Sequence, residues 1–358
     1  MRRVLPIPVT WPFVMRQLGI EGVSLIGAET SALGLELSLG LHPPATAQAV
    51  ESVSGQLAVA YGAVRARVIP STDRSDRVTV ALDWVTGIRS VAYPDFHHPV
   101  GIPANPLRPL PLGLDDRGRP VAANLYGHSV LIGGNPGAGK SNSLRVLLGG
   151  LANFDNVALY GCDPKRVELS MWRERFAALV LGNEPEPVVD LLSALLAEVD
   201  ARAQHLQGSG SATLLPSVTH PWVVLIVDEW AELGAAGDKK ARDQVAGLLR
   251  RYVALGRAVG CTAVLCTQRP TSDAIDVGTR SLLTDRFALK CGDRFQADSI
   301  LPPGSYRPAD LLGAQPGRAL WSAGGPAVAV QFYEVPDAAV PGLVQAGYRT
   351  AIGTALGR

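Results

Sequence analysis

The sequence lacks the features that mark disulfide-stabilised, zinc-binding and membrane-spanning proteins. Its 358 residues include only four cysteines, and these match no paired zinc-ligand spacing. Three of the four lie within apolar runs, which is typical of buried, reduced thiols in a cytosolic protein. No run of about 18 uncharged apolar residues occurs, so no membrane span is predicted. These absences favour a soluble, cytoplasmic protein.

The charges show no excess of either sign. The chain has 33 lysines and arginines against 32 aspartates and glutamates. This balance removes the simplest sequence argument for a nucleic-acid partner, which is a strongly basic chain. With 47% apolar and 18% charged residues, the composition is that of a globular protein. The length suggests two domains or one large one.

A proline-rich stretch over residues 99–112 divides the chain. Its prolines favour an extended connector over a helix or a central strand. Residues 1–98 predict a small α+β domain, with a helix over 45–62 and strands over 33–41 and 78–84. Residues 113–358 predict an α/β domain with a mostly parallel sheet, because strand and helix patterns alternate. The expected strands cover 129–133, 157–162, 223–227, 262–266, 287–291 and 327–335, and the expected helices cover 188–206, 241–258 and a segment from about 340.

One glycine-rich segment carries a specific chemical signature. Residues 134–141 spell GNPGAGKS and fit the phosphate-loop pattern G-x-x-x-x-G-K-[ST] without a mismatch. Glycines let backbone N–H groups face the phosphates, and the following helix adds its positive N-terminal end. We predict that Lys140 reaches the β- and γ-phosphates of ATP and that the Ser141 hydroxyl ligates Mg²⁺. The predicted nucleotide-binding residues are Gly134, Asn135, Pro136, Gly137, Ala138, Gly139, Lys140, Ser141 and Asn142.

Two later strand ends are predicted to complete this site. Residues 223–227 form an apolar run that ends in Asp228 and Glu229. We predict that Asp228 holds the Mg²⁺ shell and that Glu229 orients and deprotonates the attacking water, which suits hydrolysis. Gln268 follows the next apolar run and is placed to sense the γ-phosphate. The carboxyl ends of parallel strands meet at one edge of a sheet, so these side chains should gather there.

Five segments together resemble the FtsK/SpoIIIE family of DNA-pumping ATPases, within the wider HerA–FtsK group. Residues 163–170 (DPKRVELS) are similar to the family motif D-P-K-x-x-E-L. Residues 227–233 (VDEWAEL) resemble V-D-E-F-A-D-L, with Trp and Glu in place of Phe and Asp. Residues 255–260 (LGRAVG), 267–270 (TQRP) and 311–313 (LLG) resemble the family's R-A-x-G, A-T-Q-R-P and late L-L-G segments.

The resemblance implies a RecA-like P-loop motor that hydrolyses ATP and moves double-stranded DNA. Such motors assemble as homo-oligomeric rings, usually hexamers, in which a neighbour's arginine stabilises the transition state. Arg286 falls where the family's I-P-T-R-I-A segment has its arginine; the alternative for Arg286 is a simple salt bridge at a strand start. The chain looks most like the conjugal transfer (Tra) proteins of actinomycete plasmids and integrative elements. The implied role is conjugal transfer or chromosome segregation, with a membrane-protein partner recruiting the ring to the cell membrane as a further expectation.

Two other functions remain open at this point. One is a protein-export ATPase of the type VII secretion class, although those typically carry membrane spans and several ATPase cassettes, whereas one cassette is found here. The other is a nucleotide-gated adaptor that binds ATP and a partner without translocating. The balanced charge is compatible with a DNA motor, because a pump must release every phosphate that it contacts as it advances.

Overall fold

The computed structural model describes residues 7–84, 108–269, 275–306 and 314–346, apart from residues 32, 72, 153 and 155. These residues form two compact units. The first consists of the residues up to 84 together with Leu114–Arg119, and the second contains the remaining described residues. The predicted boundary between residues 98 and 99, and most of the proline-rich stretch, lie outside the described residues.

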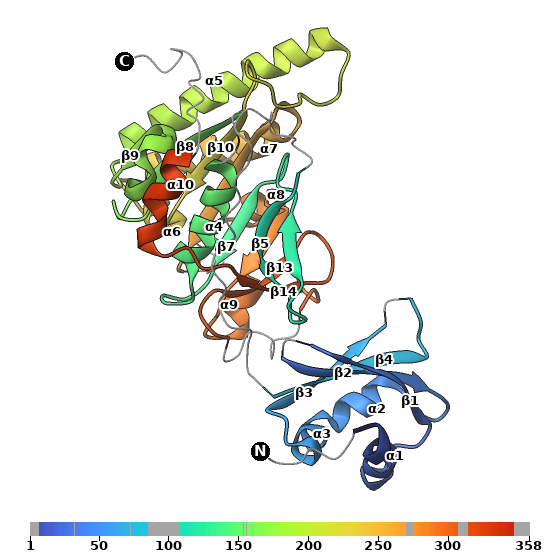
Figure 1. Cartoon of the computed structure of the whole chain (residues 1–358). Helices are drawn as coiled ribbons and strands as arrows, with labels where there is room; N and C mark the ends of the chain where they lie inside the picture. Colours follow the sequence, from blue (N-terminus) through green and yellow to red (C-terminus); the bar gives the residue numbers. More distant parts are fainter. Residues whose placement is uncertain are drawn as a thin grey trace. The chain divides into compact units, whose positions relative to one another are not determined.

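The first unit is an antiparallel sheet, in the order β1-β2-β4-β3, with three helices on one face (Figure 1). Alternate residues of β2 and β4, such as Leu37 and Val80, point into a core that includes Trp11 and Leu57 from the helices. The strands are β1 (Val23–Thr30), β2 (Gly34–Leu41), β3 (Arg65–Pro70) and β4 (Arg77–Asp83), and the helices are α1 (Ile7–Gln17), α2 (Ala47–Ser52) and α3 (Ser54–Tyr61).

The helix predicted over residues 45–62 is two helices. Val53 separates α2 from α3, with φ −103° and ψ 8°, outside the helical region. The Thr46 hydroxyl caps the start of α2 by accepting a hydrogen bond from Ala49 N–H, and Gly62 ends α3 in the left-handed conformation. Val53 is buried in the same core as Val50 of α2 and Leu57 of α3, which is why the apolar periodicity alone does not reveal the break.

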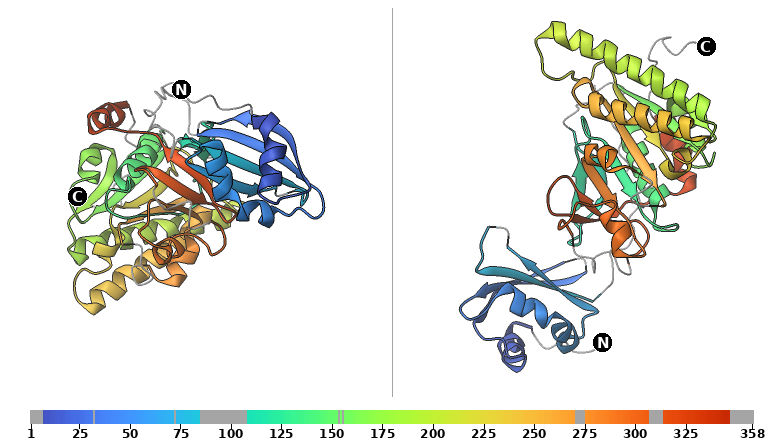
Figure 2. Two further views of the ribbon diagram at one scale, coloured as in Figure 1. Left: turned by 90° about the horizontal axis from the view of Figure 1, so that it is seen from below. Right: turned by 180° about the vertical axis from the view of Figure 1, so that it is seen from behind.

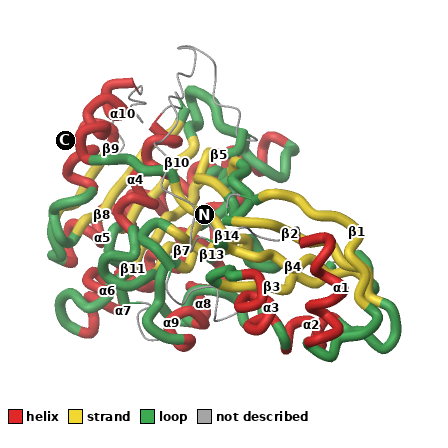
Figure 3. Tube along the Cα trace, turned by 60° about the horizontal axis from the view of Figure 1, so that its bottom comes forward, coloured by secondary structure: helices red, strands yellow, loops and turns green. Residues whose placement is uncertain are grey.

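The second unit contains a sheet of ten strands, in the order β6-β5-β14-β13-β12-β7-β11-β10-β8-β9. Figure 3 shows strands of this sheet in yellow, among them β7, β8, β10 and β11. The six strands from β12 to β9 run parallel, and β13 and β14 are antiparallel additions, so the predicted mostly parallel α/β fold is confirmed. The strands are β5 (Leu110–Leu114), β6 (Pro120–Ala123), β7 (Val130–Gly133), β8 (Val157–Asp163), β9 (Phe176–Leu181), β10 (Trp222–Val227), β11 (Cys261–Thr267), β12 (Asp285–Ala288), β13 (Arg318–Ser322) and β14 (Val328–Phe332).

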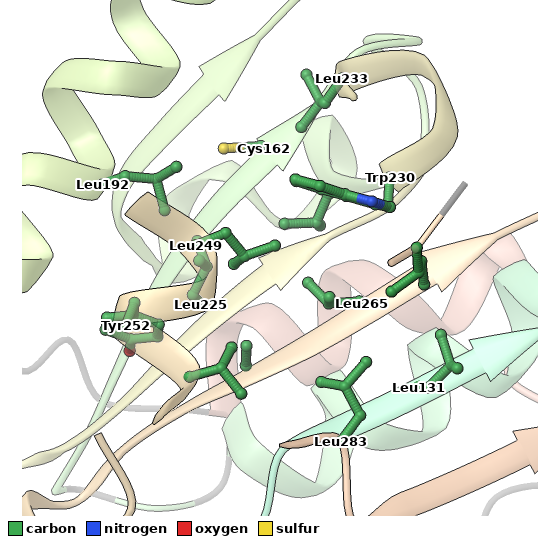
Figure 4. Close-up of a cluster of buried hydrophobic side chains, with 14 of the residues drawn as sticks. Leu131, Cys162, Leu192, Leu225, Trp230, Leu233, Leu249, Tyr252, Leu265 and Leu283 are labelled. Carbon is green, nitrogen blue, oxygen red and sulfur yellow. The ribbon is translucent and has the colours of Figure 1, made fainter. Parts of the chain in front are cut away.

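Helices cover both faces of this sheet (Figure 2). On one face, Leu192 of α5 and Leu249 and Tyr252 of α7 pack on Leu225 and Leu265 of the central strands (Figure 4). On the other face lie α4 and, against it, α10. The helices and 3₁₀ turns are α4 (Lys140–Ala152), η1 (Leu169–Arg175), α5 (Pro185–Ser209), α6 (Trp230–Leu233), α7 (Lys239–Gly256), η2 (Arg257–Val259), α8 (Val277–Leu282), α9 (Arg294–Asp298), η4 (Asp337–Ala339) and α10 (Val340–Ala346).

The end of the predicted connector is a strand. Leu110–Leu114 forms β5, so residues 110–112 belong to the sheet although Pro111 lacks an N–H donor. Leu110 and Leu112 are 2% and 0% exposed, and their burial outweighs the missing hydrogen bond. The sequence patterns do not predict strands β1, β3, β5, β6, β9 and β13. No helix among the described residues combines the length and apolar character that a membrane crossing requires.

Candidate nucleotide-binding site

Four neighbouring parallel strands deliver the predicted site residues to one edge of the sheet. The phosphate loop follows β7, Gln268 follows β11, and Asp228 and Glu229 follow β10. The next strand, β8, ends at Asp163 and leads into the segment that contains Lys165. Because β7, β11, β10 and β8 are adjacent in the sheet, segments far apart in sequence converge at their carboxyl ends.

The phosphate loop has the backbone that its glycines permit. Gly137 and Gly139 have φ values of 76° and 98°, in the left-handed region. A Cβ at Gly139 would lie 2.3 Å from the amide nitrogen of Gly317, so the loop also requires glycine for close packing. Helix α4 begins directly at Lys140, and its first N–H groups have no acceptor within the helix. These groups and the helix dipole suit an anion.

Lys140, near the end of this loop, forms a buried ion pair with Asp228, which follows β10. The Lys140 ammonium lies 2.5 Å from Asp228 Oδ1 and 2.7 Å from the Asp228 carbonyl oxygen, and both residues are 4% exposed. Burial by itself lowers the pKa of Lys140, but the neighbouring Cys266 and Asp228 outweigh it, so the pKa is raised. Lys140 therefore carries its charge at neutral pH. An ammonium, a carboxylate, the Ser141 hydroxyl and a helix N-terminus form the donor set that a magnesium–nucleotide complex needs.

Glu229 is held from two sides. It is 1% exposed, and both carboxylate oxygens accept the Gln268 main-chain N–H, at 3.0 and 3.1 Å. Its Oε2 also lies 3.4 Å from the Lys165 ammonium. Gln268 thus contacts Glu229 through its backbone, in addition to the side-chain role that the sequence predicts for it. The structure places Lys140, Asp228, Glu229 and Gln268 at the same edge of the sheet, where Lys165 joins them through its contact with Glu229.

The turn after β8 explains how Lys165 reaches Glu229. The Asp163 carboxylate is fully buried and accepts the N–H groups of Lys165 and Arg166 on Oδ1 and that of Leu169 on Oδ2. These bonds support Arg166 in the left-handed conformation, at φ 61°, which is unusual for a residue with a side chain. The sequence marks this turn through the D-P-K-x-x-E-L resemblance, but no local pattern shows that its lysine contacts the strand end at Glu229.

Asn142 and Arg286 have partners outside this cluster. The Asn142 amide donates to the Tyr333 carbonyl at 2.7 Å and accepts from Val335 N–H at 2.8 Å, so this side chain fastens α4 to the segment after β14. Arg286, on β12, donates to the carbonyl oxygens of residues 280, 283 and 300 of its own chain. Burial and the neighbouring Arg280 lower the pKa of Arg286. Pro270 and residues 311–313 of the motif segments lie outside the described residues.

Comparison with known proteins identifies similar chains. Residues 104–218 match the model of the FtsK/SpoIIIE family. The DNA translocase FtsK of Treponema pallidum is 29% identical over 209 residues, covering 54% of this chain and 26% of that protein. Protein Tra of Streptomyces lividans is 31% identical over 196 residues, covering 50% of this chain and 31% of that protein. The alignments therefore span about a quarter to a third of the length of these relatives.

Solved structures share the fold. The pCW3 conjugation coupling protein TcpA, in its monomer form with ATPgS, superposes with a TM-score of 0.65 at 18% identity, covering 94% of this chain and 98% of that chain. The cytoplasmic domain of the type VII secretion ATPase EccC of Thermomonospora curvata gives a TM-score of 0.52 at 24% identity, covering 67% and 32%. At these identities the similarity establishes the P-loop ATPase fold.

Proposed function

We propose that this chain is an ATP-hydrolysing motor that moves double-stranded DNA, because residues 104–218 match the FtsK/SpoIIIE family model and the chain is similar to FtsK translocases. The observation that supports hydrolysis is the position of Glu229. A phosphate loop alone binds a nucleotide, whereas a buried carboxylate one residue beyond the Asp228 ligand position adds a group that can act on water. Residues with these properties lie together at one sheet edge.

Each residue has a distinct task in this mechanism. The first N–H groups of α4 and the Lys140 ammonium bind the phosphates, and Ser141 and Asp228 would hold Mg²⁺. When bound, Mg²⁺ would supply positive charge that stabilises the negative charge of the phosphates. Glu229 orients the attacking water and takes its proton, while the Gln268 N–H fixes the carboxylate and the Gln268 amide is positioned to sense the γ-phosphate. Arg286 is the candidate for the arginine that one subunit supplies to its neighbour.

The relatives support one biological setting for this motor. The similarity to Protein Tra and the fold shared with a conjugation coupling protein favour conjugal transfer over chromosome segregation. We propose a homo-oligomeric ring, most simply a hexamer, that encloses the duplex and is recruited to the cell membrane by a membrane-protein partner. Ring symmetry brings the same few basic loops of every subunit to one channel, which allows DNA contact by a subunit with balanced charge.

ATP hydrolysis with and without long duplex DNA tests this proposal. We expect duplex DNA to stimulate hydrolysis several-fold. Lys140→Ala should reduce the rate to background, and Glu229→Gln should reduce kcat by about 100-fold while ATP still binds, because the base is lost and the phosphate contacts remain. Lys239→Ala serves as a control, since Lys239 is exposed on α7 and its ion pair among the described residues is with Asp243, four residues along. Normal turnover in Glu229→Gln would remove Glu229 from the mechanism.

Protein export is the second candidate, favoured by the fold shared with EccC and with the EssC ATPases of Geobacillus thermodenitrificans, at a TM-score of 0.56 and 18% identity. The same assay separates the two functions. A rate of ATP hydrolysis that is unchanged by duplex DNA but rises on addition of an exported peptide substrate supports export. A nucleotide-gated adaptor would bind ATP and show no turnover under either condition.

A further inference from the structure

The Lys165 ammonium lies 3.4 Å from Oε2 of Glu229, the proposed general base. We propose that Lys165 is a positioning residue that holds the Glu229 carboxylate in the orientation needed to act on water. This inference rests on the proposed ATP hydrolysis but not on DNA translocation. It also assigns a task to the turn over residues 163–170, whose lysine has no role in the mechanism described above.

The contacts of Glu229 show why a second hydrogen-bond donor, in addition to the Gln268 N–H, would restrict the orientation of its carboxylate. The Gln268 N–H contacts both carboxylate oxygens at nearly equal distances, 3.0 and 3.1 Å, so this donor leaves the carboxylate free to pivot about it. The Lys165 ammonium approaches only Oε2. Two donors at different positions fix the carboxylate plane and leave lone pairs of Oε1 available to a water molecule. A general base must meet the proton that it takes within hydrogen-bond distance, so fixing this plane matters for the rate.

Hydrogen bonds within the turn fix the backbone of Lys165 so that its side chain extends toward Glu229. The Lys165 main-chain N–H is fixed by the buried Asp163 carboxylate, and the next residue, Arg166, takes the left-handed conformation. The two neighbouring cations then diverge, since Lys165 reaches inward to Glu229 and Arg166 pairs with Glu184. The Lys165 side chain is 39% exposed while that of Glu229 is 2% exposed, so the ammonium approaches the buried carboxylate from the surface side. No contact joins Lys165 to the phosphate loop among the interactions of the described residues, so its effect should pass through Glu229.

Steady-state hydrolysis by three variants tests this role. We expect Lys165→Met to lower kcat by about tenfold with KM for ATP changed less than twofold, because the base is misplaced while the nucleotide contacts remain. Lys165→Arg should retain most of the rate, since a guanidinium also donates to a carboxylate. Arg166→Met is the matched control, because it removes one positive charge from the same turn without touching Glu229. In the Glu229→Gln background, Lys165→Met should have no further effect on kcat.

Other outcomes would overturn the inference. A tenfold rise in KM or in the dissociation constant for ATP would make Lys165 a nucleotide ligand. An equal loss in Arg166→Met would assign the effect to the charge of the turn, and an unchanged kcat would leave Lys165 without a role. These results are separable from failure of the translocase proposal, which is read from DNA stimulation. If the wild-type chain hydrolyses no ATP at all, both proposals fail.

Discussion

At the scale of single residues, the four cysteine thiols illustrate how burial controls reactivity. Burial raises the pKa of Cys162, Cys261 and Cys291 to about 12, and it raises that of Cys266 well above the usual range. We expect iodoacetamide at pH 8 to alkylate these thiols at least about 100-fold more slowly in the native protein than in guanidinium, since only the thiolate reacts. Intact mass measured over time gives the number of adducts.

The same shifts fix the direction of a pH effect on stability. The native thiols keep their protons up to about pH 12, whereas unfolded cysteines lose theirs near pH 8.5. The native state therefore binds more protons between these values, and the free energy of unfolding should fall as the pH rises above about 8.5. One thiol that is alkylated rapidly in the native protein would contradict this account for that residue.

Residues joined by a local motif were predictable, and residues joined only by the fold were not. Lys140 and Ser141 belong to one eight-residue pattern, and Asp228 and Glu229 end one apolar run, so sequence alone places them in the site. The contact of Lys165 with Glu229 links positions 64 residues apart through adjacent strand ends. It depends on the order of β8 and β10 in the sheet and on the turn held by Asp163, which no periodicity shows.

At the scale of elements, β12 shows that a buried polar residue with hydrogen-bond partners can make the start of a strand hard to predict from the sequence. The sequence predicts this strand over residues 287–291, but it covers Asp285–Ala288. Asp285 is 1% exposed and accepts hydrogen bonds from the Trp321 indole at 2.9 Å and from His128, 2.6 Å away. A buried carboxylate with such partners is tolerated in a strand. These partners come from other elements, so the sequence around residue 285 does not predict them.

A buried ion pair links α4 to the turn after β8. Arg145 of α4 pairs with Glu168 at 2.6 Å, with side chains 13% and 7% exposed, and it also contacts Asp337 before α10. We expect Glu168→Ala to lower the free energy of unfolding by about 3 kcal/mol, because the guanidinium loses its buried partner. Urea unfolding of the wild type and the variant measures this loss.

Glu184→Ala is the matched control for that change. Its partner is also an arginine, Arg166, but the side chains of that pair are 60% and 57% exposed. Water screens such a pair, so the variant should lie within about 0.5 kcal/mol of the wild type. Equal losses in the two variants would mean that the Arg145–Glu168 pair does not hold these elements together.

At the scale of the whole molecule, two different roles can be proposed for Arg286. In the structure its guanidinium binds three carbonyls of its own chain, around the start of β12 and the segment after α9. That arrangement alone predicts a cis effect, in which removing Arg286 damages its own subunit. The proposed ring predicts a trans effect, in which the neighbour's site loses its arginine. The two roles give opposite results when differently defective subunits are mixed.

We expect an equal mixture of Arg286→Ala and Lys140→Ala subunits to hydrolyse ATP faster than the sum of the separate variants. An Arg286→Ala subunit keeps its phosphate loop and regains the missing arginine wherever its donor neighbour is Lys140→Ala. With random mixing, roughly a quarter of the interfaces have this order, which bounds the recovery at about a quarter of the wild-type rate. A mixture of Lys140→Ala and Glu229→Gln is the control. Lys140 and Glu229 act in the same subunit, so every site in this mixture lacks one of them and no neighbour can supply it. If the rate of each mixture equals the sum of the rates of its separate variants, Arg286 stabilises its own subunit and does not act on the neighbour's site.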